Sequence, residues 1–116
     1  MFAPKRILVP TDFSSDSDEA LKEAVELAKQ YHSKVYLLHV SEPIMQCSAD
    51  YCLDFVALKQ AEAEEINRAR AQMQEELRKM GMTEDVEIIS DIREGDTVTE
   101  ILKEQDERGV DLIVMP

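Results

Sequence analysis

Four short runs rich in apolar residues alternate with longer segments in which apolar residues recur at helical spacing. The first run, Ile7–Val9, is mostly β-branched and is stopped by Pro10. The other runs are 35–40, 86–90 and 110–115. Because these runs are nearly continuous rather than alternating, each predicts a strand that is buried on both faces.

The segment after Pro10 predicts the first helix. It is rich in capping residues, and Asp16 followed by Glu19 offers a cap with an acidic residue in the first turn. From Leu21 to Tyr31 the apolar residues fall on one helical face.

Two further helices are predicted between the later strands. The first should end at Gly81, and we expect its apolar stripe to cover the sheet, although a partner could also use it. This stripe consists of Ile66, Ala69, Met73, Leu77 and Met80. The second helix should begin at Thr97, which has Glu100 at capping-box spacing, and end at Gly109. Its side chains expected to face inward are Val98, Ile101 and Leu102.

The order of these elements, strand and helix three times and then a strand, predicts the fold class. Apolar strands separated by helices form a parallel sheet that is covered on both faces. Right-handed crossovers then produce an open, doubly wound α/β fold of the Rossmann-like type. With 116 residues and no internal repeat, residues 1–116 are expected to form a single domain.

The charge balance narrows the range of partners. The chain is 44% hydrophobic and 33% charged, and its net charge of -12 repels nucleic acid and anionic membranes. A helix N-terminus can still hold a small anion. No apolar run approaches the ~20 residues of a membrane span, and the first residues have no signal-peptide pattern. We therefore expect a cytoplasmic protein that binds neither nucleic acid nor membrane.

Two cysteines, Cys47 and Cys52, lie in the polar segment 41–54, which is predicted to be a loop. Their spacing is not that of a zinc site, and too few other ligands lie nearby. A local disulfide is disfavoured in a reducing compartment. We expect two free thiols and no metal site.

The candidate chemistry lies at the end of the first strand. Ligands of doubly wound sheets bind outside the carboxyl ends of the strands, where the strand order reverses. Pro10, Thr11 and Asp12 occupy such an end. Asp12 could accept hydrogen bonds from ribose hydroxyls or an adenine amino group, and Thr11 could offer its hydroxyl. The alternative is that Asp12 and the nearby serines only cap the first helix.

The segment 5–14, Lys-Arg-Ile-Leu-Val-Pro-Thr-Asp-Phe-Ser, resembles the opening of the universal stress protein family. Segments 20–28, 35–40, 95–102 and 111–115 are similar, in order, to the family's first helix, second strand, third-helix entry and fourth strand. The resemblance covers nearly the whole chain. It implies an adenine nucleotide alpha hydrolase-like fold, usually a homodimer, with a role in stress survival rather than catalysis.

The resemblance also implies site residues. In nucleotide-binding members, the carboxylate matching Asp12 and the second-strand residue matching Val40 lie at the adenosine, and the backbone around Pro10 and Thr11 shapes the same pocket. Met115 matches the position where the phosphate loop begins. The implied ligand is ATP or another adenine nucleotide, such as AMP, and no residue is expected to be catalytic.

The sequence departs from the family pattern after the fourth strand. Nucleotide-binding members continue with a G-x-x-G-x9-G-[ST] loop, whose glycines let backbone amides approach phosphates. A last helix and a fifth strand follow in the family, whereas the printed sequence stops at Pro116. Because residues 112–115 would otherwise form an exposed apolar edge, we expect the native protein to continue or a partner strand to cover them.

Three other functions stay open. A dimeric interaction protein of the same fold would act without nucleotide. A phosphoacceptor receiver domain would use Asp91, but it needs an acidic pair beside Asp12 and a lysine from a later strand. An ATP-hydrolysing enzyme would need a phosphate clamp, and the sequence contains no G-x-x-x-x-G-K-[ST] pattern. His39, near the end of the second strand, could be packed or could contact a ligand.

Overall fold

The structure is a computed structural model, and it describes residues 3–42, 55–81 and 85–116. Within these residues, four strands alternate with three helices. The strands are β1 (Arg6–Pro10), β2 (Lys34–Ser41), β3 (Ile88–Glu94) and β4 (Leu112–Ile113). The helices are α1 (Ser15–Tyr31), α2 (Phe55–Met80) and α3 (Thr97–Arg108). Cys47 and Cys52 lie outside the described residues, so the free thiols stay a prediction.

The four strands form one parallel sheet in the order β3-β2-β1-β4. Leu8 of β1 lies opposite Tyr36 of β2 and opposite Ile113 of β4, so β1 has a neighbour on each side. The chain runs from β1 through β2 to β3 at one edge and then crosses back to β4 on the far side of β1. This arrangement confirms the predicted doubly wound fold and puts the reversal of strand order at β1.

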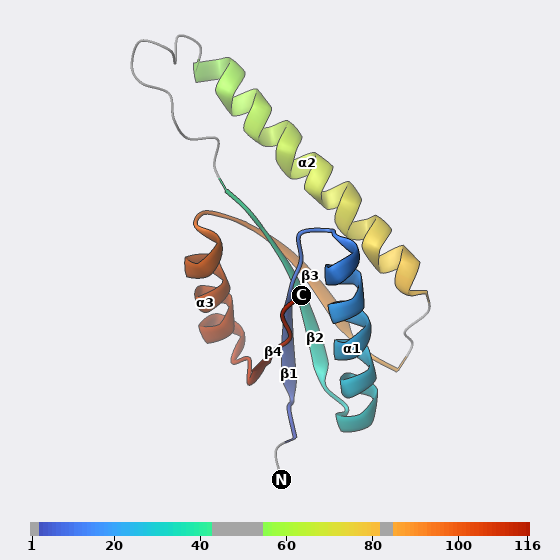
Figure 1. Ribbon diagram of the computed structural model, residues 1–116. Coiled ribbons are helices and arrows are strands. Elements are labelled where there is room, and N and C mark those ends of the chain that lie inside the picture. The colour runs from blue at the N-terminus through green and yellow to red at the C-terminus, as the bar shows by residue number, and fades with distance from the viewer. Residues whose placement is uncertain (1–2, 43–54, 82–84) are drawn as a thin grey trace.

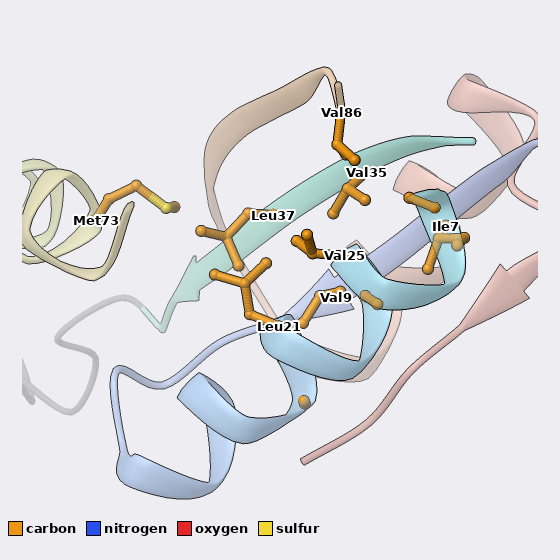
Figure 2. Close-up of a cluster of buried hydrophobic side chains, with 11 residues drawn as sticks. Ile7, Val9, Leu21, Val25, Val35, Leu37, Met73 and Val86 are labelled. Carbon is orange, nitrogen blue, oxygen red and sulfur yellow. The ribbon is translucent and has the colours of Figure 1, made fainter. Parts of the chain in front are cut away.

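Helices cover both faces of the sheet, with α1 and α2 on one face and α3 on the other (Figure 1). Successive β1 side chains point to opposite faces. Ile7 and Val9 therefore pack against α1, where Leu21 is fully buried, as Figure 2 shows. Leu8 points the other way and packs in the cluster that contains Ile101 of α3. The positions of β1 that serve the two cores are therefore apolar, whereas Arg6 at the start of the strand is exposed.

Both predicted helix caps are displaced by one or two residues. In α1 the N-cap is Ser14 rather than Asp16, and its hydroxyl accepts the backbone N–H of Ser17 at 3.2 Å. In α3 the N-cap is Asp96 rather than Thr97. The predicted capping residues already have helical backbone, whereas an N-cap has extended backbone, as Ser14 and Asp96 do.

The face that α3 turns to the sheet is partly different from the predicted one. Ile101 is buried as expected, but Val98 and Leu102 are 66% and 55% exposed, so their predicted inward orientation was wrong. Glu104 is buried instead and accepts a hydrogen bond from Nη1 of Arg93 in β3 at 2.8 Å. The Arg93 guanidinium on the sheet is largely buried and therefore needs carboxylates beside it. For this reason the acidic side of α3, rather than the side with Val98 and Leu102, packs against the sheet.

The apolar stripe of α2 covers the sheet through its C-terminal part. Ala69 and Met73 are buried, and Leu77 and Met80 pack against the same cluster. Helix α2 ends before Gly81, whose φ of +77° is in the left-handed region that favours glycine. The stripe therefore serves the core. No helix in the described ranges is long and apolar enough to cross a membrane.

The later strands do not occupy the predicted residues. Strand β3 extends to Glu94 instead of ending at residue 90, because it stays paired with β2 up to the pair Ser41–Glu94. Strand β4 is shorter than the predicted 110–115. Among the residues that the structure describes, it pairs with β1, and the residues in register with that strand are Leu112 and Ile113.

Two leucines on different helices test this packing. We expect Leu21→Ala to lower the free energy of unfolding by about 2–5 kcal/mol, because it leaves a cavity at a fully buried position. Leu102→Ala is the matched control, and its side chain is mostly exposed, so its effect should stay within about 0.5 kcal/mol. Urea unfolding followed by circular dichroism measures both. Equal losses would show that Leu102 is buried in solution.

Candidate functional site

A cavity of about 200 Å³ opens at the carboxyl end of β1, between the ends of β2 and β4 and the start of α3. Its lining includes all five residues that the sequence analysis selected: Pro10, Thr11, Asp12, Val40 and Met115. The strand order reverses at β1, so α1, which follows β1, and α3, which precedes β4, lie on opposite faces of the sheet with this space at the strand ends between them.

The walls of the cavity are mainly apolar, and the polar residues of its lining are Thr11, Asp12, His39 and Thr97. Leu38 and Ile101 are buried in its wall, whereas Met115 is 60% exposed at its rim. Pockets for drug-sized ligands measure about 300–1,000 Å³. The cavity is smaller, so it suits one flat ring system with the rest of a ligand outside.

A larger hollow of about 350 Å³ lies between α2 and β3, where Arg70, Gln74 and Ser90 belong to its lining. It borders the outer edge of the sheet, since β3 is the last strand on that side. The smaller cavity lies where the strand order reverses, which is the usual ligand position in this fold class.

Thr11 is buried and makes a hydrogen bond with each of its polar groups. Its N–H donates to the carbonyl of Leu38 at 2.8 Å, and its own carbonyl accepts from Nδ1 of His39 at 2.9 Å. Its Oγ1 donates to Oε2 of Glu76 at 3.1 Å and accepts from the N–H of Phe13 at 3.0 Å. The hydroxyl expected to serve a ligand is therefore engaged with α2, and Thr11 offers the cavity a fixed backbone.

Phe13 and His39 pack against each other, and each also hydrogen-bonds to Thr11. Phe13 has a φ of +66°, a left-handed conformation that costs free energy for a bulky residue and is held here by its bond to Thr11. Its ring lies against the His39 ring, with centroids 4.4 Å apart. Because a carbonyl oxygen only accepts, Nδ1 of His39 carries the proton in its bond to Thr11. His39 is thus packed and also lines the cavity.

Asp12 supports the start of α1 and stays exposed. Its Oδ1 accepts from the backbone N–H of Ser14 at 3.0 Å and from the hydroxyl of Ser17 at 2.7 Å. The hydroxyls of Ser14 and Ser17, with the Ser14 N–H, lower the pKa of Asp12 to about 2. Asp12 is therefore not the helix cap, but it holds the capping serine, and its carboxylate is ionised at neutral pH.

Glu76 is the residue of this region that the sequence analysis missed. It is only 3% exposed, and its Oε1 has no hydrogen-bond partner among the described residues. Burial and the neighbouring carboxyl of Asp18 raise the pKa of Glu76 to about 7. The sequence did indicate that Glu76 is buried. It lies seven residues after Ala69 and therefore on the same helical face, which packs against the sheet.

The receiver alternative finds no support in the geometry around Asp91. This residue lies inside β3 rather than after it, and its carboxylate binds Nη2 of Arg108 at 3.4 Å. It is not part of the lining of the cavity at β1. In the ranges that the structure describes, no three His, Cys, Asp or Glu side chains are grouped to hold a metal ion.

Comparison with known proteins gives a consistent family assignment. Residues 4–116 match the model of the universal stress protein family. Universal stress protein MJ0531 of Methanocaldococcus jannaschii is 30% identical over 115 residues, which are 96% of this chain and 63% of that protein. The chain therefore spans less than two thirds of the length of this curated relative.

Two solved structures share the fold. Universal stress protein UspA from Lactobacillus plantarum superposes with a TM-score of 0.80 at 22% identity, over 96% of this chain and 75% of that one. A universal stress protein in complex with cAMP superposes with a TM-score of 0.68 at 18% identity, over 97% of this chain and 71% of that one. With the family match over nearly all of its length, the chain belongs to the universal stress protein family.

Proposed function

We propose that this universal stress protein binds the adenosine part of an adenine nucleotide, such as ATP or AMP, at the carboxyl end of β1. The observation that carries the proposal is that Pro10, Thr11, Asp12, Val40 and Met115, from three separate strand ends, line one cavity. The protein would act in the stress response through nucleotide binding rather than catalysis.

The chemistry of the cavity fits the two parts of adenosine. Leu38, Val40 and Ile101 provide an apolar wall for the faces of the adenine ring. The Asp12 carboxylate, ionised because its pKa is lowered to about 2, would accept hydrogen bonds from ribose hydroxyls. The Ser14 N–H and the Ser17 hydroxyl both donate to Oδ1, and we assign Oδ2 to the ligand. A hydrogen bond to a charged group contributes about 1.5–3 kcal/mol.

Related proteins support the same ligand class. A universal stress protein of this fold was solved in complex with cAMP, which contains adenosine. The negative net charge of -12 opposes phosphate binding in general, but a ligand bound by its base would keep its phosphates in solvent. A homodimer and a cytoplasmic location belong to the proposal as implications of the family, and both stay predictions.

Replacing the Asp12 carboxylate tests the proposal. We expect adenosine and ATP to bind the wild type, and Asp12→Asn to weaken adenosine binding roughly 10-fold or more, since the loss of one charged hydrogen bond is worth that factor. Isothermal titration calorimetry measures both ligands.

Asp16→Asn is the matched control, because it removes the same charge from an exposed residue of α1 that does not line the cavity. This variant should bind like the wild type. Absence of binding by the wild type, or equal weakening in the two variants, would contradict the proposed site.

The ionised state of Asp12 depends on Ser17, which donates to it at 2.7 Å. Ser17→Ala should raise the pKa of Asp12 from about 2 toward its ordinary value. An Asp with a lowered pKa stabilises the fold above its unfolded-state pKa and loses this effect as the pH falls toward 2. In Ser17→Ala, Asp12 should therefore contribute less stability above its unfolded-state pKa, and this smaller contribution should be lost over a narrower range of pH.

The carboxyl carbon shift of Asp12, followed by NMR from pH 6 downward, measures this change. Ser15→Ala is the control, because Ser15 is exposed and makes no hydrogen bond to Asp12. An unchanged Asp12 midpoint in Ser17→Ala would show that the Ser17 hydroxyl does not bind the carboxylate.

A further inference from the structure

Glu76 is a buried acid that hydrogen-bonds to Thr11, a residue of the cavity lining. It comes from α2, is 3% exposed, and accepts the Thr11 hydroxyl on Oε2 at 3.1 Å. Its second oxygen, Oε1, is buried and has no hydrogen-bond partner in the part of the chain that the structure describes. An unsatisfied buried acceptor costs about 1–3 kcal/mol and more when it is charged, so the carboxylate form is disfavoured here.

Charged and titratable groups from each neighbouring element face this acid. From α1, the Asp18 carboxyl lies within hydrogen-bonding reach of Glu76 and raises its pKa after burial, the larger cause. From α2 itself, Lys79 acts in the opposite direction and pairs with Asp18 Oδ2 at 3.8 Å. From the sheet, Thr11 is neutral, and the His39 ring reaches the group only through the Thr11 carbonyl.

Protonation of Glu76 removes its buried charge and gives it a hydrogen-bond donor toward Asp18. A neutral carboxyl has one O–H donor, and the Asp18 carboxylate is the acceptor within its reach. Without that proton, the buried carboxylate of Glu76 lies near the half-buried carboxylate of Asp18, and their repulsion is stronger than it would be in water. The charge-assisted bond from Thr11 offsets only part of this cost, since its effect on the pKa is smaller than those of burial and Asp18.

Thr11 connects the state of Glu76 to the cavity. The Oγ1 atom that donates to Glu76 also accepts the N–H of Phe13 and so holds its left-handed turn. The Thr11 backbone is part of the cavity wall and precedes Asp12, the proposed ribose ligand. If α2 moves to hydrate an ionised Glu76, the Thr11 hydroxyl loses its anchor, and the turn before α1 loses its order.

We propose that Glu76 is a proton-controlled positioning residue, which holds Thr11 in the binding geometry when it is neutral and weakens adenine nucleotide binding when it ionises. The effect on binding rests on the function proposed above, whereas the coupling of Glu76 to the turn at residues 11–13 does not.

The direction of the pH dependence follows from the raised pKa. Glu76 is neutral in both the folded and unfolded states well below its ordinary pKa of 4.5. As the pH rises from 4.5 to about 7, the unfolded chain has lost its proton while the folded chain retains it, so stability falls. Above about pH 7 the folded protein carries the ionised acid, and this is the range in which we expect weaker binding.

Adenosine titrations at pH 6 and pH 8 test the proposal in the full chain. Coupling between two sites typically changes affinity by about 5- to 150-fold, and we expect a loss at the lower end, about 5-fold, on going to pH 8. Glu76→Gln should remove this dependence, because its side chain keeps the shape and an acceptor for Thr11 but cannot ionise. Equal pH profiles for the wild type and Glu76→Gln, or tighter binding at pH 8, would overturn the proposal.

Glu75→Gln is the matched control. Glu75 is the neighbouring residue on α2, but it is exposed and paired with Arg78, so its removal should leave the pH profile unchanged. Asp18→Asn provides an independent variant if Glu76→Gln does not fold. It removes the facing carboxylate and should therefore move the midpoint of the pH dependence downward, and an unmoved midpoint would count against the proposal.

A measurement without ligand separates this proposal from the proposed function. The backbone amide shifts of Thr11 and Phe13 should titrate with a midpoint of about 7 in the wild type and lose this step in Glu76→Gln. A step that persists in that variant would assign the titration to another group and overturn the proposal. Absence of adenosine binding with an intact Glu76 titration would instead refute the nucleotide site and leave the coupling established.

Discussion

Parallel hydrogen bonding of β1 to β2 on one side and to β4 on the other is the constraint on which the rest of the structure depends. With both edges and both faces covered, β1 must be apolar at its buried positions, and Ile7, Leu8 and Val9 fill two cores in turn. The chain leaves β1 toward β2 over one face and reaches β4 over the other. The space at its carboxyl end follows from this path, and Pro10, Thr11 and Asp12 occupy it.

Two buried glutamates attach helices to this sheet in different ways. Glu104 of α3 has the Arg93 guanidinium at 2.8 Å, which offsets part of the cost of burial, although burial and the neighbouring Asp91 carboxyl still raise its pKa. Glu76 of α2 meets the neutral Thr11 hydroxyl, while the nearby charge of Asp18 has the same sign as its own. Burial raises the pKa of both acids, but only Glu76 lies against the turn that shapes the cavity. The contact with Thr11, rather than burial beside another carboxyl, therefore distinguishes Glu76 from Glu104.

Prediction from the sequence succeeded where local pattern and burial agree. The continuous apolar strands and the helical stripe on α2 both identify surfaces that must be covered, and the fold class follows from their order. Prediction failed for α3, where Val98 and Leu102 fit an apolar stripe as well as Ile101 does. The inward face of α3 depends on Arg93 in β3, and the helix sequence alone contains no information about that partner.

The sequence by itself determined the alternation of strands and helices, the family, and the residues at the end of β1. Each of these depends on the order of residues that are close together along the chain. Only the tertiary structure decided which of these residues meet. It brings Val40 and Met115 to the cavity beside β1, and it joins Thr11 to Glu76 across 65 positions. Such contacts depend on the packing of α2 and the register of the sheet. Burial beside another carboxyl then turns an ordinary helical glutamate into a group that titrates near neutral pH.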